Sequence, residues 1–153
     1  MSSFTFSQTN FSGIWVLKTK QQLTGPEYLN ALPTKIIVTQ QKDSIVIEST
    51  TIGPDGTEAT IKQVIAIDGK PYYSTTQSSR RKYVRTFQWV KSNNSFLIKT
   101  VYYLPDNDNE IDFTRLDTWL LKEGELMIDR RSVETNSETW ETVGIFKRNE
   151  LTR

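Results

Sequence analysis

The chain has 153 residues, with 19 Lys and Arg, 18 Asp and Glu, and neither histidine nor cysteine. Without these two residue types the sequence excludes disulfides, thiolate and imidazole metal ligands, histidine-ligated haem, and cysteine or histidine catalysis. We therefore expect no metal and no cofactor. The net charge of +1 creates no field that favours nucleic acid, which we do not expect as a partner.

Residues 1–10 are polar apart from Phe4 and Phe6, and they predict a loose lead-in to a single domain that spans residues 1–153. A domain of this size buries roughly 68–70% of its unfolded surface without added staples. The lead-in lacks the basic and apolar regions of a signal peptide, so we expect a cytoplasmic protein or an exported one whose leader has been removed. No run approaches the ~20 apolar residues of a membrane-spanning helix.

The first strand is predicted over residues 11–20, where alternation places Trp15, Leu17 and Thr19 on one face. Residues 21–33 contain a glycine and two prolines and predict a connection. Within it, residues 26–32 are long enough for about two helical turns that begin with a proline at the first position. This is the one short helix that we expect.

The following segments are rich in β-branched and aromatic residues and are separated by turn residues. Such spacing is typical of an all-β sandwich or barrel. Lys42 and Asp43 separate two of these segments and predict a two-residue hairpin loop. The expected strands cover residues 34–41, 44–51, 57–68, 70–76, 82–91, 95–104 and 138–148.

Residues 113–130 predict a β-hairpin that turns at Glu123 and Gly124. Antiparallel partners add to a constant residue number, so a two-residue loop places Trp119 opposite Ile128 and Asp117 opposite Arg130. The same register pairs Lys122 with Glu125 and Leu121 with Leu126. One face is then apolar near the turn and carries a charge pair further along, which suits the wall of a barrel with a partly polar cavity.

Together these segments predict an all-β fold, a meandering antiparallel up-and-down β-barrel of about nine or ten strands with one short helix. A two-layer sandwich is the alternative. We favour closure because the chain proceeds hairpin by hairpin, and pairing the first strand with the last would remove an exposed sheet edge.

Three stretches carry a resemblance to a known superfamily. They are the opening Phe11-Ser-Gly-Ile-Trp-Val-Leu, the strand Thr86-Phe-Gln-Trp before a polar turn, and the hairpin from Asp117-Thr-Trp-Leu-Leu to Arg130. With the last strand ending Ile145-Phe-Lys-Arg148, this pattern resembles the calycins, meaning lipocalins and fatty-acid-binding proteins, and is most similar to small bacterial lipocalin-like proteins. The resemblance implies a lipocalin-like barrel that holds a small molecule.

The sequence also departs from these families. The segment between the first two strands is too short for the two-helix lid of fatty-acid-binding proteins, and the Thr-Asp-Tyr motif of classical lipocalins is missing. The carboxylate-anchoring Arg-x-Tyr of fatty-acid-binding proteins would fall on Gly144-Ile-Phe146, which forms neither contact. The resemblance therefore implies the architecture and transfers no ligand chemistry.

The candidate ligand-binding residues are those that alternation places on single faces of the predicted strands around residues 82–91, 95–104 and 113–130. Arginine holds a carboxylate or phosphate by two parallel hydrogen bonds, and tyrosine hydroxyls supplement it in an apolar wall. The residues are Tyr83, Arg85, Phe87, Trp89, Tyr102, Arg115, Asp117 and Arg130.

These residues leave two interpretations open. In the first, they bind a small, largely apolar ligand non-covalently inside the barrel, with or without an acidic head group. In the second, Asp117 simply neutralises Arg130, Arg85 and Arg115 reach outward, and the aromatics are ordinary core. An arginine in excess of the internal carboxylates would favour the ligand.

Two further functions remain as alternatives. We expect a monomer or a weak homodimer. A side-chain-filled barrel would be a structural or protein-interaction module, with Leu116, Leu120 and Met127 on its partner surface. An isomerase or cyclase would use Asp117, whose pKa an apolar barrel would raise. No residue spacing identifies a substrate, so we expect no enzyme.

Overall fold

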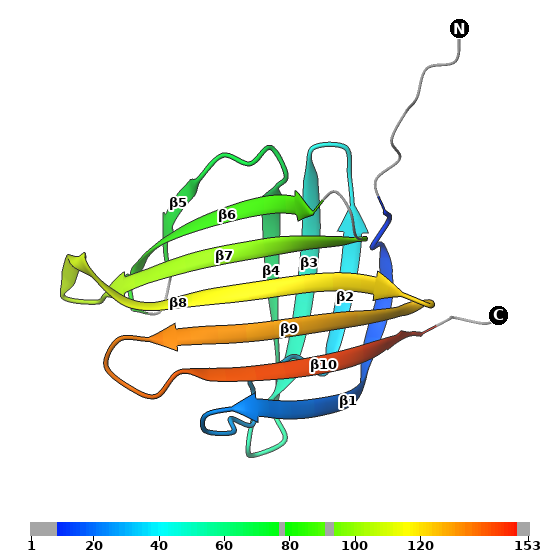
Figure 1. The fold of residues 1–153 in the computed structure, drawn as a ribbon, viewed down its shortest axis with the longest axis horizontal. Coiled ribbons are helices and arrows are strands. Elements are labelled where there is room, and N and C mark those ends of the chain that lie inside the picture. The colour runs from blue at the N-terminus through cyan, green and yellow to red at the C-terminus, as the bar shows by residue number, and fades with distance from the viewer. Residues whose placement is uncertain (1–8, 77–78, 91–93, 150–153) are drawn as a thin grey trace, which may run out of the picture.

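The computed structural model describes residues 9–76, 79–90 and 94–149. These residues form one ten-stranded antiparallel sheet that curls into a nearly closed barrel (Figure 1). The strands are β1 (Gly13–Thr24), β2 (Lys35–Gln40), β3 (Ser44–Ile52), β4 (Glu58–Ala66), β5 (Tyr72–Thr75), β6 (Lys82–Val90), β7 (Ser95–Leu104), β8 (Asn107–Lys122), β9 (Glu125–Glu134) and β10 (Trp140–Arg148). The expected lead-in at residues 1–8, with Phe4 and Phe6, lies outside the described residues.

The first and last strands pair, as the sequence predicted. β1 lies antiparallel to β10, from Trp15 opposite Arg148 to Thr24 opposite Glu141. The barrel is therefore confirmed over the sandwich. Closure is incomplete, however, because the sheet order begins at β4 and ends at β5, and these two strands are not paired with each other.

Both predicted two-residue hairpin loops are present. The Gln41 amide N–H donates to the Ser44 carbonyl over 2.8 Å, which closes the loop at Lys42 and Asp43. Glu123 and Gly124 have φ angles of 54° and 80°, as a type I′ turn requires. The register that follows this second turn pairs Trp119 with Ile128 and Asp117 with Arg130, which confirms the predicted hairpin.

The predicted helix over residues 26–32 is wrong: the segment forms irregular turns, and the described part of the chain contains no helix. Tertiary contacts override the local preference there. The side-chain amide of Gln22, on β1, donates to the carbonyl of Pro26 over 2.8 Å, which ties the start of the segment to that strand. The segment instead folds into the barrel end and buries Ala31 and Leu32.

An aromatic cluster fills the end of the barrel where β1 begins. Phe96 stacks on Trp119 with 5.1 Å between the ring centroids, and Phe11 meets Phe96 edge-on at 4.8 Å. The indole N–H of Trp15 donates to the Phe11 carbonyl over 2.9 Å. This end of the interior is therefore a solid apolar floor.

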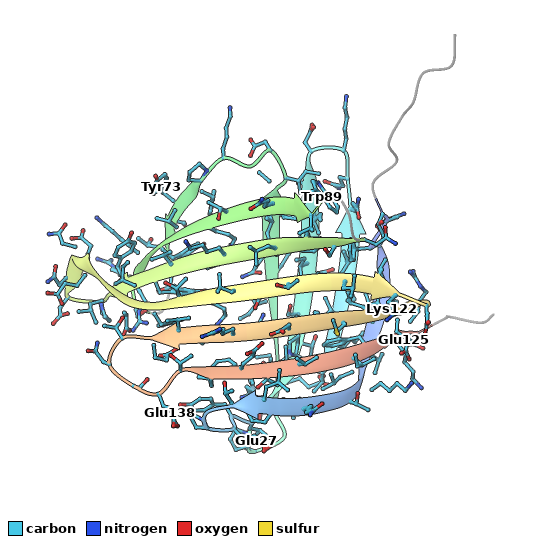
Figure 2. All side chains as sticks on the ribbon, viewed as in Figure 1. Glu27, Tyr73, Trp89, Lys122, Glu125 and Glu138 are labelled. Atoms are coloured by element: carbon cyan, nitrogen blue, oxygen red, sulfur yellow. The ribbon has the colours of Figure 1, made fainter. Side chains whose placement is uncertain are left out.

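The opposite end of the barrel is where β1, β3, β7 and β9 finish. Figure 2 shows Lys122 and Glu125 at the turn between β8 and β9, and Glu27 and Glu138 at the other end of the molecule.

The described residues include no helix with the length and apolar character needed to cross a membrane.

Candidate functional site

A cavity of about 340 Å³ lies in the barrel beyond the aromatic floor. One wall, built by β6 to β9, carries most of the charge, and the facing wall, built by β2 to β4, carries three isoleucines. Asn30 and Pro33 of the connection between β1 and β2 complete the lining. The facing wall contributes Ile36, Ile47, Ser49, Thr51, Ile61 and Gln63.

Strand register explains why the charged side chains meet. In antiparallel pairs, directly opposed residues project to the same face of the sheet. Thr100 lies opposite both Arg85 on β6 and Arg115 on β8, and Arg115 in turn lies opposite Ser132 on β9. These four residues form one row across the inner face, which we call the arginine row.

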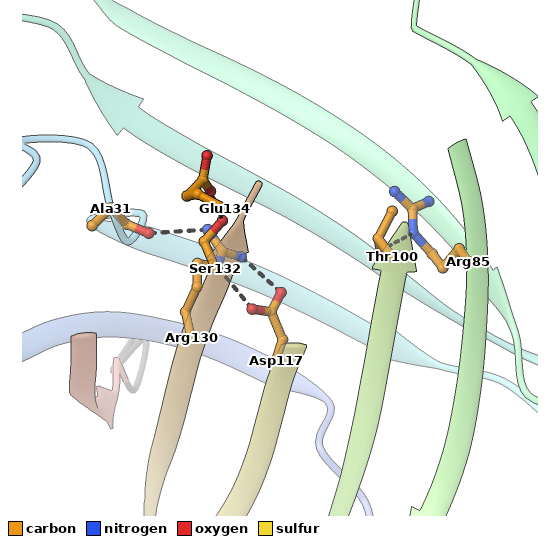
Figure 3. A network of polar contacts seen from close by, with 7 residues as sticks. All are labelled: Ala31, Arg85, Thr100, Asp117, Arg130, Ser132 and Glu134. Carbon is orange, nitrogen blue, oxygen red and sulfur yellow. Dashed lines mark hydrogen bonds and ion pairs between the residues drawn. The ribbon is translucent and has the colours of Figure 1, made fainter. Parts of the chain in front are cut away.

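The next row, one step nearer the floor, contains the ion pair predicted from the sequence. Arg130 donates from Nε to one oxygen of Asp117 over 2.8 Å and from Nη2 to the other over 3.0 Å (Figure 3). Its Nη1 donates to the Ala31 carbonyl over 3.1 Å, which ties the connection to the barrel wall. Burial by itself lowers the pKa of Arg130, but the attraction and hydrogen bonds of Asp117 outweigh it and raise that pKa.

Arg115 lies in the arginine row without such a partner. Its Nε is buried with no hydrogen-bond acceptor among the described residues, and none of their carboxylates forms an ion pair with it. The guanidinium packs on the rings of Phe113, at 5.2 Å, and Trp140, at 5.5 Å. Burial, followed by repulsion from Arg130, lowers the pKa of Arg115.

Arg85 is the second unpaired cation, with only 8% of the residue exposed. Its Nε donates to the Thr100 hydroxyl oxygen over 3.3 Å, and its guanidinium lies 4.8 Å from the ring centroid of Tyr83. No ion pair joins it to a carboxylate within the described ranges. The lining thus holds three arginines and one carboxylate, Asp117.

Five of the eight predicted site residues line the cavity: Arg85, Tyr102, Arg115, Asp117 and Arg130. The other three lie beside it. Phe87 and Trp89 belong to the aromatic floor, in edge contact at 5.1 Å, and Tyr83 packs between Tyr72 and Tyr102. Part of the purely structural interpretation is also correct, because Asp117 does pair with Arg130. Arg85 and Arg115, however, face inward.

Sequence reasoning missed the apolar wall. Ile47, Ser49 and Thr51 follow the same alternation as the predicted strand residues, so the pattern contained a signal for that face. It did not indicate which face turned inward. Asn30 and Pro33 carried no signal at all, because their position depends on how the connection packs against Arg130 and β10.

The described residues contain no cluster of three potential metal ligands of the histidine, cysteine or acidic type. In the comparisons with known proteins, no family model matches the chain and no curated protein matches it. The functional argument therefore depends on the cavity itself.

Proposed function

We propose that this protein binds a small, largely apolar molecule with an acidic head group, non-covalently, inside its barrel. The observation that carries the proposal is a pair of arginines that face the cavity with no ion-pair partner among the described residues: Arg85, which is buried, and Arg115, which is partly buried with a fully buried Nε. The calycin resemblance of the sequence is part of the same proposal, and the ten-stranded meander supports it.

The charges supply the reason for an acidic head group. Burying a cation without a counter-charge is unfavourable by several kcal/mol, and the one ion pair that Asp117 forms among the described residues is with Arg130. An anion held by a buried guanidinium supplies the counter-charge and accepts two parallel hydrogen bonds. Arg115, whose Nε has no other acceptor, gains most from such a contact.

The facing wall supplies the reason for an apolar body. Ile36, Ile47 and Ile61 project from β2 to β4, and Trp119 covers the floor. A volume of about 340 Å³ lies at the lower end of the usual range for small-molecule pockets. The ligand is therefore compact, with its charged side toward β6 to β8 and its apolar side toward the isoleucines.

The two alternatives have less support. A side-chain-filled interaction module does not account for the cavity, and Leu116, Leu120 and Met127 are half-buried on the outer face. An enzyme would need an available base, whereas both carboxylate oxygens of Asp117 accept hydrogen bonds from Arg130. Binding without chemistry is the function that the geometry favours.

The experiment titrates the purified protein with octanoate, octyl sulfate, octyl phosphate and neutral octan-1-ol. Binding is followed by tryptophan fluorescence, because Trp119 lines the cavity and Trp140 packs on Arg115, and by native mass spectrometry for stoichiometry. We expect at least one anion to bind about tenfold more tightly than the alcohol, since a charged hydrogen bond contributes about 1.5–3 kcal/mol.

Two variants give the matched comparison. Arg115→Met removes the cavity charge and keeps an unbranched apolar side chain, whereas Arg131→Met removes the same charge from the exposed outer face of β9. We expect the first to reduce the preference for anions, because only Arg85 then remains unpaired, and the second to retain it in full. The proposal would be overturned if none of the three anions bound below millimolar concentration. It would also be overturned if Arg115→Met and Arg131→Met preferred anions over the alcohol to the same degree.

A further inference from the structure

The excess charge in the cavity is two positive units among the described lining residues. Arg85, Arg115 and Arg130 are balanced only by Asp117. Glu134 lies outside this lining and forms no ion pair with these arginines; its charge attracts Arg115, and its carboxylate accepts hydrogen bonds from the hydroxyls of Ser132 and Ser137. A ligand with a single negative charge would leave one of the two unpaired arginines without a counter-charge inside the cavity.

The two unpaired arginines flank one side chain. Arg85 and Arg115 are the direct cross-strand neighbours of Thr100, so their backbones lie two strand spacings apart, roughly 10 Å. Both side chains border the same cavity, in front of Thr100. The Thr100 hydroxyl oxygen accepts from Arg85 over 3.3 Å, and its own proton has no acceptor among the described residues.

We propose that the acidic head group is a phosphate monoester, which carries two negative charges and bridges Arg85 and Arg115 over Thr100. The inference rests on the proposed function and names the ligand class for the same cavity. Three phosphate oxygens serve two guanidinium groups and the threonine hydroxyl together. The apolar body attached to the phosphate lies against the isoleucines of β2 to β4.

A carboxylate fits this arrangement less well. Its two oxygens lie in one plane and are satisfied by a single guanidinium fork, as Asp117 is by Arg130. A tetrahedral phosphate presents oxygens in several directions, so it accepts from arginines on two different strands. The positions of Arg85 and Arg115 on opposite sides of Thr100 match the second geometry.

The test compares octyl phosphate with octyl sulfate, which has the same tail and a tetrahedral head group. At pH 7.5 the phosphate carries close to two charges and the sulfate one, whereas at pH 5 both carry about one, because the second phosphate pKa is about 6. We expect octyl phosphate to bind about tenfold more tightly than octyl sulfate at pH 7.5 and nearly equally at pH 5. Because the sulfate keeps its charge throughout, it reports any titration of the protein itself.

Variants locate the preference. Arg85→Met and Arg115→Met should each remove most of the phosphate preference at pH 7.5, whereas the surface variant Arg131→Met should retain it. If a cavity variant does not fold, the comparison of the two ligands in the unaltered protein still decides. Octylmalonate, whose two carboxylates also carry two charges, tests phosphate against a dicarboxylate.

The failures of the two proposals are distinguishable. If octyl sulfate and octanoate bind as tightly as octyl phosphate at pH 7.5, the dianion inference is wrong and the proposed function stands. Tighter binding of octylmalonate than of octyl phosphate overturns the assignment to phosphate. If none of these anions binds, both proposals fall together.

Discussion

The residues Asp117 and Arg130 brace the barrel wall against the connection that closes it. Arg130 uses both nitrogens of its fork on Asp117 and its remaining nitrogen on the Ala31 carbonyl. A pair of this kind contributes little relative to two apolar residues, but breaking it leaves a partly buried charge without a partner. Its value lies in fixing the geometry next to the arginine row.

This balance predicts the outcome of a double-mutant cycle. Asp117→Leu should lower the free energy of unfolding by about 3 kcal/mol, the lower end of the range for a buried pair, because Arg130 loses its counter-charge while both side chains keep some exposure. Adding Arg130→Met should restore most of that loss, since no lone charge remains. Urea denaturation of the unaltered protein, the two single variants and the double variant measures the coupling between the two side chains. A double variant no more stable than Asp117→Leu alone would contradict this account.

Among the strands, the sequence predicts the register where the residues that determine it lie close together in the chain. The β8–β9 hairpin was predictable in register because its turn residues and its alternation lie in one continuous stretch. β1 was not. A register shift between Leu17 and Thr19 places Thr19 opposite Ile145 and on the exposed side, although simple alternation groups it with Trp15. A bulge of this kind has no signal in residue types alone.

The connection between β1 and β2 was missed for a related reason. Its shape depends on residues far away in the sequence, beginning at Gly25, which has a φ of +73°. A Cβ there would lie 2.3 Å from the carbonyl oxygen of Thr139 and 2.8 Å from the Cα of Trp140, both backbone atoms. Gly25 is therefore required by a contact with the start of β10 as well as by its own conformation.

The glycine Gly56 offers a matched control for this contact. Its φ is +83°, but a Cβ there would meet nothing within 4 Å. Gly56→Ala should lower stability by about 1 kcal/mol through backbone strain alone, and Gly25→Ala should lower it by at least about 2 kcal/mol because the clash adds to the strain. Thermal and urea unfolding measure both changes, and equal losses would show that the contact with β10 does not constrain the connection.

For the whole molecule, the sequence predicted the barrel and the pairing of its first and last strands, together with most of the charged wall of the site. It did not predict the gap between β4 and β5. Ile61 shows why: it lines the cavity yet is 62% exposed, because it lies on an edge strand where the barrel stays open. An alternating pattern marks a face, and only the full set of strand pairings shows where the sheet ends.

The absence of histidine affects how the stability of the whole molecule depends on pH. An unperturbed histidine is the side chain that titrates near neutral pH, and this chain has none. On the outer face of β9, burial and the neighbouring carboxylate of Glu141 raise the pKa of Asp129 to about 6. The pH dependence of stability near neutrality should therefore depend largely on this one carboxyl group.

The direction of this pKa shift determines whether stability rises or falls with pH. Between its ordinary pKa of 3.8 and about 6, Asp129 holds a proton in the folded state that it has lost in the unfolded state, so stability falls as pH rises through this range. Asp129 is partly exposed, and solvent screening reduces the expected loss to about 1 kcal/mol between pH 4.5 and 7.5. Asp129→Asn should remove this loss, whereas Asp106→Asn, which deletes the same charge from an exposed turn, should not. Urea denaturation at a series of pH values tests the difference. If stability changes with pH in the same way in the unaltered protein and in Asp129→Asn, the carboxylates of Asp129 and Glu141 do not interact.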